Sequence, residues 1–449
     1  MNTPICDFVR RYAESGSLRF HMPGHKGRDT FGGIFPAAAL DITEITGADV
    51  LYASDGIIGE SEWNAASLFG SARTLFSTEG SSLCVRAMLY LAVLHAKLQG
   101  RSPRITAARN AHRVFLEAAA LLDCEVLWFG SCAGLLEARP DPDELQSLFA
   151  SEDTSPTAVY VTDPDYLGNS VDLTALAEVC HRHGALLLVD SAHGAYRKFL
   201  PDSRHPLDRG ADLCCDSAHK TLPVLTGGAY LHASKTCPPD LLPLMERAMS
   251  LFASTSPSWL ILQSLDAANS LLAGDYPSRI RDTAARLDRV KRLLQSDGWK
   301  LAGDEQLKLT LRSKERGWTG TELEAWLVER GMVPEFSDPD YLVLMLTPEN
   351  TPGEMDTLCD ALRSVPLRPV VKDGPPPVGR PHPVLSLREA LFAPFERVSV
   401  DRCLGRVLAS PSVSCPPAVP ICVCGERIDE DAMRLFLYYG VAACEVVKE

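Results

Sequence analysis

The chain has 449 residues, of which 46% are hydrophobic and 23% are charged, and this composition is typical of a soluble globular protein with a sizeable core. A formal net charge of −14 argues against nucleic acid or an anionic membrane as the main partner. The sequence contains no run of apolar residues long enough for a membrane span and no basic segment followed by an apolar one at its start, so we expect a cytoplasmic protein.

The first half of the chain predicts an α/β fold. Residues 1–60 hold loops and turn signals, with helical periodicity only at their start, and predict an N-terminal arm. Two helical stretches follow between residues 62 and 99. Helical segments then separate several short apolar strand candidates, which lie at residues 105–107, 125–129, 158–162, 186–190, 213–216 and 229–232. Strands that alternate with helices are typical of βαβ units, so we expect a large domain over 61–265 with a mostly parallel sheet and the site along one sheet edge.

The second half predicts two smaller units. Its first part contains helical patterns at residues 260–273, 280–294 and 321–329, and strand candidates at residues 307–311 and 341–346. These segments predict a smaller α/β domain over 266–370. Prolines and glycines between Asp373 and Gly379 predict a linker over 371–385. Residues 386–449 then predict a small C-terminal α+β domain.

The strongest chemical signal is a carboxylate at the end of a strand, followed by a lysine. The apolar run 185–189 ends in Asp190, and Lys220 follows 30 residues later. This arrangement is what a pyridoxal phosphate enzyme requires, because the lysine amine forms a Schiff base with the cofactor aldehyde and the carboxylate pairs with the protonated pyridine nitrogen. A lone lysine is usually a surface charge. Together, Lys220 and Asp190 predict pyridoxal 5′-phosphate as the cofactor.

Small and hydroxyl-bearing residues indicate where the phosphate would bind. Thr78–Ser82 precedes a helical run over 83–97, and a helix N-terminus offers backbone N–H groups and the positive end of the helix dipole to an anion. Serine-rich helix caps are common without any ligand. In combination with the lysine and the carboxylate, however, the predicted phosphate contacts are Gly80, Ser81, Ser82, Ser217 and His219.

Two histidines are candidates for contacts with the cofactor ring. His112 follows the strand candidate at 105–107, and an imidazole stacked on the pyridine ring there would hold the cofactor flat and assist proton transfer. A histidine in this position is often only a loop residue. His193 lies three residues after Asp190 and would hydrogen-bond the phenolic oxygen of the cofactor or position the substrate. The alternative for His193 is a polar residue that only caps the strand end.

The 14 cysteines predict neither disulfides nor a metal site. They are scattered along the chain, and several lie in apolar runs, among them Cys214 and Cys215. Cys422 and Cys424 form a C-x-C pair without a second pair at zinc-finger spacing. We therefore expect free thiols and no bound metal.

Several separate motifs resemble those of the Orn/Lys/Arg decarboxylase family. They are His21–Gly27, Asp41–Ile45, Asp55–Ile58, Ser217–Leu222, Thr255–Ser258, and Pro416–Pro420 with Gly425 and Glu426. The resemblance covers nearly the whole chain and is to the short form of the family, without an N-terminal response-regulator-like domain. It implies a pyridoxal phosphate enzyme of the aspartate aminotransferase fold, also called fold type I.

The resemblance also implies roles for individual residues. Lys220 would be the Schiff-base lysine, Asp190 the partner of the pyridine nitrogen, and His112 the ring-stacking histidine. Ser256 would approach the phosphate across a subunit interface, so we expect a homodimer or higher homo-oligomer with a shared active site. The remaining residues around the phosphate would be Gly80, Ser81, Ser82, Ser217 and His219.

Three segments depart from the family pattern. Asp163–Gly168 stands where Ser-Pro-Thr-Tyr is usual, and Tyr52 is followed by Ala53 instead of a Pro-Glu pair. Glu79 occupies a position where a neutral asparagine is common, and because a carboxylate would repel phosphate, we expect it to face solvent or a cation. These changes leave the cofactor prediction intact and bear on the identity of the substrate.

The predicted reaction is the decarboxylation of a basic L-amino acid, namely arginine, lysine or ornithine, to its amine, as in polyamine biosynthesis. The predicted catalytic residues are Lys220, His112, Asp190 and His193. The substrate displaces Lys220, loses carbon dioxide, and is protonated at Cα by Lys220 or His112. The distal cation of the substrate needs an acidic or polar partner, for which the candidates are Glu44, Asp49, Asp165 and Glu335.

Two other functions remain open. An aminotransferase or carbon–sulfur lyase would use the same cofactor, with an arginine such as Arg312 to bind the substrate carboxylate. A non-catalytic paralogue would regulate an active enzyme. The altered segments at Asp163 and Tyr52 motivate this second alternative, whereas the retained Lys220 and Asp190 oppose it. Production of a keto acid, or the absence of bound cofactor, would separate these functions from decarboxylation.

Overall fold

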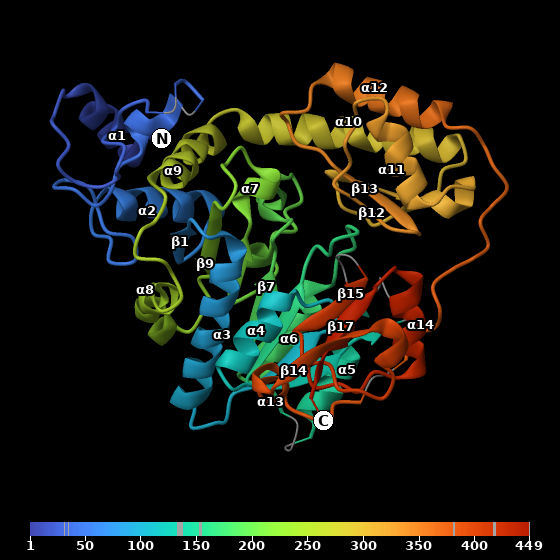
Figure 1. Ribbon diagram of the computed structural model, residues 1–449. Coiled ribbons are helices and arrows are strands. Elements are labelled where there is room, and N and C mark those ends of the chain that lie inside the picture. Colours follow the sequence, from blue (N-terminus) through green and yellow to red (C-terminus); the bar gives the residue numbers. More distant parts are fainter. Residues whose placement is uncertain are drawn as a thin grey trace. The chain divides into compact units, whose positions relative to one another are not determined.

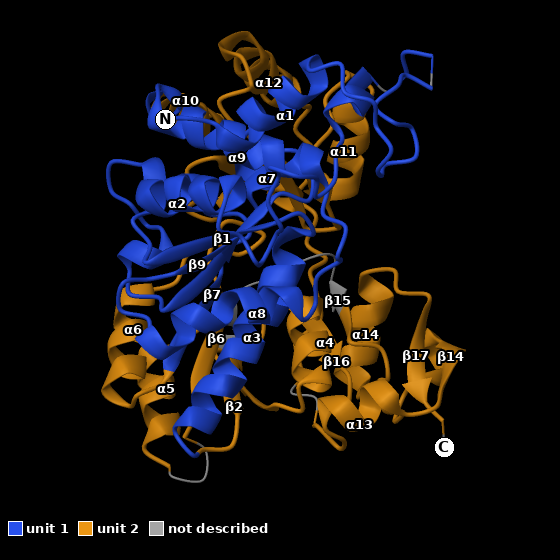
Figure 2. Ribbon diagram, turned by 90° about the vertical axis from the view of Figure 1, so that its left-hand side faces the viewer, with its two compact units in different colours: residues 1–100, 186–278 blue, residues 101–185, 279–449 orange. Residues whose placement is uncertain are grey.

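The computed structural model describes residues 1–30, 32–34, 36–132, 138–151, 155–379, 382–415 and 419–448. The motif residues Pro416, Pro417 and Ala418 lie outside the described residues. The chain divides into two compact units, which Figure 2 shows in different colours. Unit 1 comprises residues 1–100 and 186–278, and unit 2 comprises residues 101–185 and 279–449.

Unit 1 contains four strands in the order β1-β9-β8-β7, and the helices around them are labelled in Figure 1. The strands are β1 (Arg73–Ser77), β7 (Leu186–Asp190), β8 (Leu213–Asp216) and β9 (Ala229–Ala233). β7 and β8 are parallel, whereas β9 is antiparallel to both β8 and β1. The helices are α1 (Pro4–Glu14), α2 (Ile57–Phe69), α3 (Gly80–Leu98), α7 (Ala218–Thr221), α8 (Met245–Ser250), α9 (Trp259–Ala273) and the start of α10 (Tyr276–Ser296), with 3₁₀ turns at Pro36–Leu40, Ala195–Phe199, Pro206–Asp208 and Pro239–Leu244.

Unit 2 begins with three parallel strands in the order β6-β2-β3, which are β2 (Arg104–Ala108), β3 (Glu125–Phe129) and β6 (Ala158–Thr162). A separate antiparallel sheet has the order β10-β11-β13-β12, with β10 (Leu301–Ala302), β11 (Lys308–Arg312), β12 (Phe336–Ser337) and β13 (Tyr341–Met345). Three antiparallel pairs complete its strands: β4 (Ser131–Cys132) with β5 (Ala138–Arg139), β14 (Phe395–Ser399) with β17 (Ala443–Val447), and β15 (Ser412–Cys415) with β16 (Val419–Val423).

The helices of unit 2 complete the layers that cover these sheets. They are α4 (Arg113–Leu121), α5 (Pro142–Phe149), α6 (Leu173–Arg182), the remainder of α10, α11 (Gly320–Val328), α12 (Pro352–Ser364), α13 (Leu387–Phe392) and α14 (Glu430–Tyr438), with 3₁₀ turns at Ser313–Arg316 and Val400–Arg402. Ser, Thr and Asp side chains cap several of their N-termini. Thr319, Thr351 and Ser386 each form a capping box with a glutamate three residues later, in which the two side chains accept two backbone N–H groups at the start of the helix.

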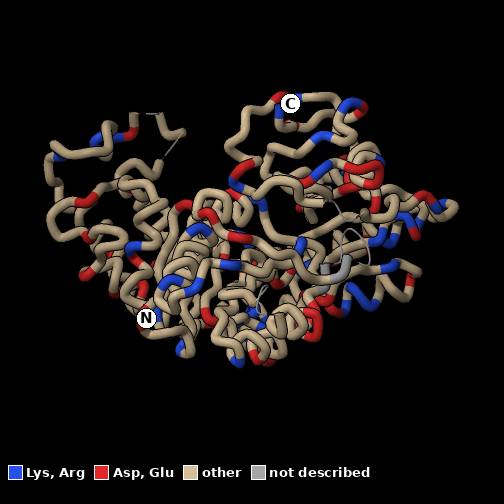
Figure 3. Tube along the Cα trace, turned by 90° about the horizontal axis from the view of Figure 1, so that it is seen from below, with Lys and Arg blue, Asp and Glu red and all other residues tan. Residues whose placement is uncertain are grey.

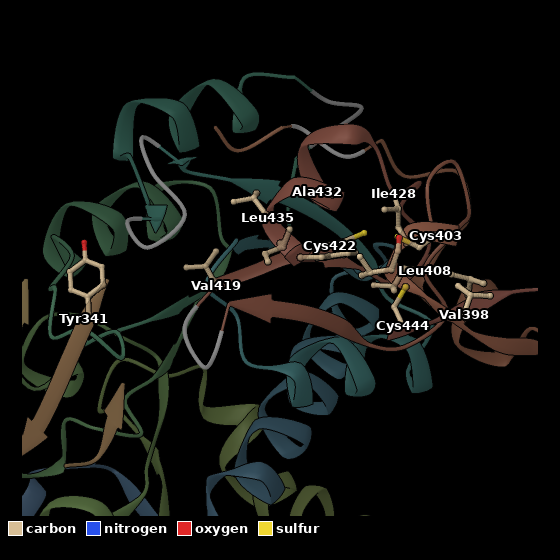
Figure 4. Packing of buried hydrophobic residues seen from close by; sticks show 14 of the residues in the cluster. Tyr341, Val398, Cys403, Leu408, Val419, Cys422, Ile428, Ala432, Leu435 and Cys444 are labelled. Carbon is tan, nitrogen blue, oxygen red and sulfur yellow. The ribbon is translucent and has the colours of Figure 1, made fainter. Parts of the chain in front are cut away.

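The C-terminal segment of unit 2 has its own hydrophobic cluster, which Figure 4 shows from close by. Val398, Leu408, Cys422 and Leu435 are among its buried members, together with Tyr341 and Val343 of β13. The neighbouring residues Leu342 and Leu344 belong to a different cluster, with α10, α11 and α12. Because successive side chains of a strand point to opposite faces, β13 packs one face against each cluster. The C-terminal segment is thus joined to the sheet that precedes it.

Most strands and helices expected from the sequence are confirmed. The candidates at 125–129, 158–162, 186–190 and 213–216 coincide with β3, β6, β7 and β8, and the other strand candidates differ by one residue at their ends. Helix α10 begins four residues before the helical pattern expected at 280–294. Strand β1 was not predicted, because its residues were interpreted as the break between two helical stretches. Only Leu75 and Phe76 are apolar in it, yet nearly the whole strand is buried by pairing with β9. Helix α2 begins at Ile57, inside the predicted arm.

Helix α3, with 19 residues from Gly80 to Leu98, is long enough and apolar enough to cross a membrane. Within the structure, 61% of its most apolar window is buried, as is usual for a core helix of a soluble protein. Acidic and basic residues are interspersed along the chain in Figure 3.

Candidate active site

Lys220 and His193 meet in unit 1. β7 ends at Asp190, and His193 follows it in the next turn, while β8 ends at Asp216 and leads through Ser217 into α7, which carries Lys220. Since β7 and β8 are adjacent and parallel, their carboxyl ends lie at the same sheet edge. As a result, the Nζ atom of Lys220 lies 3.2 Å from the Nε2 atom of His193. His193 is 5% exposed, and Lys220 is half-buried.

The Asp190 carboxylate is buried at the end of β7, with 4% of the residue exposed. Its Oδ1 atom accepts a hydrogen bond from the Ala192 N–H at 3.1 Å and a longer one from the Cys215 thiol at 3.7 Å. Burial raises the pKa of Cys215 well above its usual value, so the thiol remains protonated and is a donor. Both contacts hold the carboxylate at the end of β7, the place predicted for the partner of the pyridine nitrogen.

Two of the predicted phosphate contacts touch each other. The hydroxyl of Ser217 donates a hydrogen bond of 2.8 Å to the hydroxyl of Ser81, which lies in the first turn of α3. Gly80, Ser81 and Ser82 are half-buried, and a Cβ atom at Gly80 would meet no other atom within 4 Å. Open space therefore adjoins the helix N-terminus, where N–H groups of the first turn lack partners within the helix. The Gly80 N–H itself donates to Gly227 O at 2.7 Å.

The loop opposite Gly80 needs a glycine at position 227. Gly227 has φ +99°, and a Cβ atom there would lie 2.9 Å from the carbonyl oxygen of Thr78. The loop consequently approaches the α3 N-terminus closely enough for the Gly80–Gly227 hydrogen bond. Gly227 is not among the site residues predicted from the sequence, although two consecutive glycines, Gly227 and Gly228, are a signal of close backbone approach.

His219 faces the same loop. Its backbone N–H and its Nδ1 atom lie 3.1 Å and 2.9 Å from the carbonyl oxygen of Gly228. Because a carbonyl oxygen only accepts, Nδ1 carries a proton, and burial lowers the pKa of the imidazole so that the ring favours the neutral form. A neutral ring of this tautomer presents a lone pair at Nε2. A contact from Nε2 to phosphate would therefore require a protonated His219.

The segment that contains Ser256 is tied to the phosphate loop through Glu79. The Ser256 N–H donates to the Ser254 hydroxyl at 3.1 Å, and the Ser254 N–H donates to the Glu79 carboxylate at 2.8 Å. Glu79 is exposed to solvent, which agrees with the expectation that its charge points away from the phosphate position. Ser256 is also exposed in the single chain.

His112 belongs to unit 2. It is the N-cap residue of α4, directly after the loop that follows β2, and its Nδ1 atom accepts a hydrogen bond of 3.3 Å from the Val114 N–H. An accepting Nδ1 places the proton of the neutral ring on Nε2. The imidazole is exposed within its unit.

A buried group of two histidines and an aspartate surrounds the end of β8, where Asp216 directly precedes the lysine segment, and was not predicted from the sequence. The Oδ2 atom of Asp216 is 2.8 Å from His205 Nε2 and 3.2 Å from His232 Nε2, and all three side chains are 0% exposed. Their ligand-type atoms all lie within 4.8 Å of one another, as a metal ion would require. However, His205 Nδ1 accepts from the Leu207 N–H and His232 Nδ1 lies 2.8 Å from the Thr74 hydroxyl. We interpret the group as a hydrogen-bond network in which both Nε2 atoms donate to Asp216.

This network is expected to stabilise the fold. Replacement of Asp216 by alanine would leave two buried N–H groups without their acceptor, and each such loss costs about 1–3 kcal/mol, so the free energy of unfolding should fall by about 3 kcal/mol. Denaturant unfolding of the cofactor-free protein measures this change. Asp202→Ala is the control, because Asp202 forms an exposed ion pair with Arg209 and such pairs contribute about 0–1 kcal/mol. Equal stability of the Asp216 variant and the wild type would contradict the prediction.

The same network predicts the pH dependence of stability. Burial by itself would raise the pKa of Asp216, but the two imidazoles outweigh it and hold the pKa well below the ordinary value of 3.8. A depressed carboxyl pKa stabilises the folded protein above the unfolded pKa, and this stabilisation is lost as the pH falls through the folded pKa. Burial also lowers the pKa of His232 below 6.5, so protonation of this residue at acid pH destabilises the fold further.

Three of the four acidic candidates for binding the distal cation of a substrate have other partners in the structure, namely Asp49, Asp165 and Glu335. Asp49 is buried, and its carboxylate accepts backbone N–H groups of Val50, Gly56, Ile58 and Gly59 at the start of α2. Asp165 accepts hydrogen bonds from the backbone and side chain of Asn169, and burial raises its pKa to about 6. Glu335 accepts from the Tyr166 hydroxyl at 2.7 Å, and Glu44 is exposed. Asp49 and Asp165 are therefore explained by local structure.

The altered segment at Asp163 forms a closed turn within unit 2. Asp163 is fully buried, and its Oδ1 atom accepts from the Val171 N–H at 2.9 Å. The buried ammonium group of Lys308 donates to the carbonyl oxygens of Asp165 and Tyr166 and pairs with Glu305 at 3.1 Å. The acidic side chains of this turn accept hydrogen bonds from backbone N–H groups, and this structural role explains why acidic residues occur there. Tyr52, in the other altered segment, has φ +65° and donates its hydroxyl to Phe76 O at 3.0 Å.

Comparisons with known proteins agree along most of the chain. The description "Orn/Lys/Arg decarboxylase, major domain" matches residues 3–308, and "Orn/Lys/Arg decarboxylase, C-terminal domain" matches residues 379–447. The chain is 29% identical over 463 residues to the uncharacterized protein YaaO of Bacillus subtilis (strain 168), covering 97% of this chain and 93% of that protein. It is also 29% identical over 467 residues to the arginine decarboxylase of Halalkalibacterium halodurans, covering 95% of this chain and 91% of that protein.

A solved structure confirms the predicted α/β fold. The lysine decarboxylase of Francisella novicida matches with a TM-score of 0.79, over 99% of this chain and 81% of that chain. Its sequence identity to this chain is 16%, so this likeness shows the fold alone.

Proposed function

The chain belongs to the Orn/Lys/Arg decarboxylase family, and we propose that it uses pyridoxal 5′-phosphate to decarboxylate arginine, lysine or ornithine to the corresponding amine. Members of this family use pyridoxal phosphate. The observation that supports the proposal best is the 3.2 Å approach of Lys220 to His193 at the ends of two adjacent parallel strands. The first of these strands also ends in the buried Asp190.

The described residues of unit 1 fit this cofactor. Lys220 offers an amine beside an imidazole, and Asp190 offers a buried carboxylate for a cationic ring nitrogen. The open space at Gly80, next to the hydrogen-bonded hydroxyls of Ser81 and Ser217, is suited to a phosphate group. These residues, together with Ser82 and His219, are the proposed cofactor-binding set, and Ser256 would join it from a second subunit.

The bound cofactor would supply an electron sink for the carbon–carbon bond that breaks. Asp190 places a carboxyl group at the sheet edge, and its contacts with Ala192 and Cys215 fix the direction of that group. His193 orients the Lys220 amine and can exchange a proton with it across 3.2 Å. Lys220 or His112 is the proposed donor of the proton to Cα after carbon dioxide leaves. Lys220 is favoured, because Nδ1 of His112 accepts the Val114 N–H and its neutral ring has a single proton to give.

Arginine is the first substrate to test, since the family relative from H. halodurans is named an arginine decarboxylase. A role in polyamine synthesis, a cytoplasmic location and a homodimer with shared active sites complete the proposal. The net charge of −14 suits a cationic amino acid better than an anionic partner.

The test is a visible absorbance spectrum of the purified protein, followed by carbon dioxide release with arginine, lysine and ornithine in separate reactions. We expect cofactor absorbance and carbon dioxide from one of the three. A spectrum with bound cofactor and a keto acid product would instead indicate an aminotransferase. Absence of cofactor absorbance after reconstitution would contradict the proposal and favour a regulatory paralogue.

A further inference from the structure

The C-terminal segment of unit 2 forms a buried ion pair with the loop after β2. Arg109 directly follows the last residue of β2, and Glu426 lies just after β16. Two parallel contacts join them, from Arg109 Nη1 to Glu426 Oε1 at 2.6 Å and from Nη2 to Oε2 at 2.7 Å. The side chains are only 12% and 3% exposed. Such a two-pronged pair fixes orientation as well as distance, because both partners are planar.

Further contacts hold both members of this pair in place. The Oε2 atom of Glu426 also accepts from the Val423 N–H at 2.9 Å, which anchors the carboxylate to its own strand. The Arg109 guanidinium stacks 5.0 Å from the centre of the Trp128 ring. Arg109 Nη2 also lies 3.5 Å from the carbonyl oxygen of Ile421. Glu426 is thus an anchored carboxylate that makes the two shortest of these contacts with the Arg109 side chain.

The same C-terminal segment contacts the other end of α4. Arg388 in α13 donates hydrogen bonds to the carbonyl oxygens of Ala120 at 3.0 Å and Leu121 at 3.1 Å, at the C-terminal end of that helix. The last carbonyl groups of a helix have no N–H donor four residues later within it. Ala120 O is also contacted by the Asp123 N–H at 3.4 Å. Arg388 gives both carbonyl groups a charged donor and carries the favourable charge for that end of the helix. The segment therefore holds the nine-residue helix at its end and, through Arg109, just before its start.

His112 is the N-cap of α4 and lies three residues after Arg109. The short connection between them is itself fixed, since the Ala111 N–H donates to Ala108 O at 3.2 Å and the Thr162 hydroxyl donates to Asn110 O at 3.3 Å. A shift of Arg109 would consequently displace the cap residue, and the Val114 N–H bond to His112 Nδ1 reports that displacement.

We propose that Glu426 and Arg109 are positioning residues for His112, and that setting this imidazole is a role of the C-terminal domain in catalysis. The inference rests on the proposed function, in which His112 contacts the cofactor ring. Glu426 acts through Arg109 and touches neither cofactor nor substrate. The C-terminal domain then contributes to catalysis, because the Arg109 guanidinium loses its two-pronged contact when the Glu426 carboxylate is removed.

The experiment compares Glu426→Gln, His112→Ala and the double variant with wild type. Glu396→Gln is the matched control, since Glu396 pairs with Arg406 inside the same segment and is not part of the α4 contacts. We expect Glu426→Gln to lower kcat/KM on the order of 10- to 100-fold, the effect of a small misplacement of a catalytic group. In the His112→Ala background the same change should have an effect of less than about twofold, because residues that act as a unit are not additive.

A second readout uses the cofactor-free protein. Hydrogen exchange of the Val114 amide should be at least about tenfold faster in Glu426→Gln, because its bond to His112 is weakened, and unchanged in Glu396→Gln. Unchanged Val114 exchange in Glu426→Gln overturns the inference whether or not the wild type is a decarboxylase. Additive losses of kcat/KM in the double variant also overturn it. If Glu426→Gln does not fold, Arg109→Lys keeps the charge and removes the two-pronged contact, with the same outcomes expected.

Discussion

Replacement of Lys220 by alanine is expected to remove the visible absorbance of covalently bound cofactor and to lower kcat for decarboxylation at least about 10³-fold. The variant loses the amine that attaches the cofactor and a proposed proton donor, and general acid catalysis alone contributes about 10²- to 10⁴-fold. Absorbance of the dialysed protein and carbon dioxide release with the preferred substrate measure the two effects.

The control for this variant is Lys235→Ala, which removes an exposed lysine shortly after β9 and should leave absorbance and rate unchanged. The Lys220 variant should also fold without cofactor, since the lysine is half-buried and lies outside the hydrophobic core. Covalently bound cofactor in Lys220→Ala would show that another lysine carries it.

Replacement of Asp190 by asparagine is expected to lower kcat on the order of 10²- to 10³-fold, the range seen when one preorganised electrostatic contact is removed. The amide keeps the shape and the hydrogen bond from Ala192 but lacks the charge that pairs with a cationic ring nitrogen. Covalent attachment through Lys220 should persist, so cofactor absorbance remains while the rate falls. This combination separates the roles of the two residues.

Asp240→Asn serves as the control, because this carboxylate is exposed at the start of a 3₁₀ turn in the same unit. We expect it to have wild-type activity. An Asp190→Asn variant with an unchanged rate would mean that the ring nitrogen does not need a charged partner, and the assignment of Asp190 would then be wrong.

Local sequence was sufficient for the elements that carry the cofactor chemistry. The strands β7 and β8 are short runs of apolar residues bounded by polar ones, and both ends were identified at Asp190 and Asp216. Once two strands are parallel neighbours, the residues after them must share a sheet edge. For this reason Asp190 and Lys220 were expected along one sheet edge, whereas the contact of His193 with Lys220 is a finding of the structure. The roles of all the site residues stay predictions.

Other features depended on contacts that sequence spacing does not reveal. Strand β1 has little apolar character and is defined by its pairing with β9. The acidic residues Asp49 and Asp165 looked available for a substrate, but in the fold their carboxylates satisfy backbone N–H groups. Polar side chains are equally plausible as ligands or as caps until their neighbours are known.

The amino-acid sequence by itself determined the α/β fold, the family and the lysine and carboxylate at one sheet edge, because these depend on periodicity and on motifs within short stretches. Only the tertiary structure decided which distant residues support them. His205, Asp216 and His232 come from a turn and two strands, and Arg109 pairs with Glu426, 317 residues away. Such pairs are needed because a buried charge or N–H group is costly without a partner, and only the fold determines which residue lies close enough to be that partner.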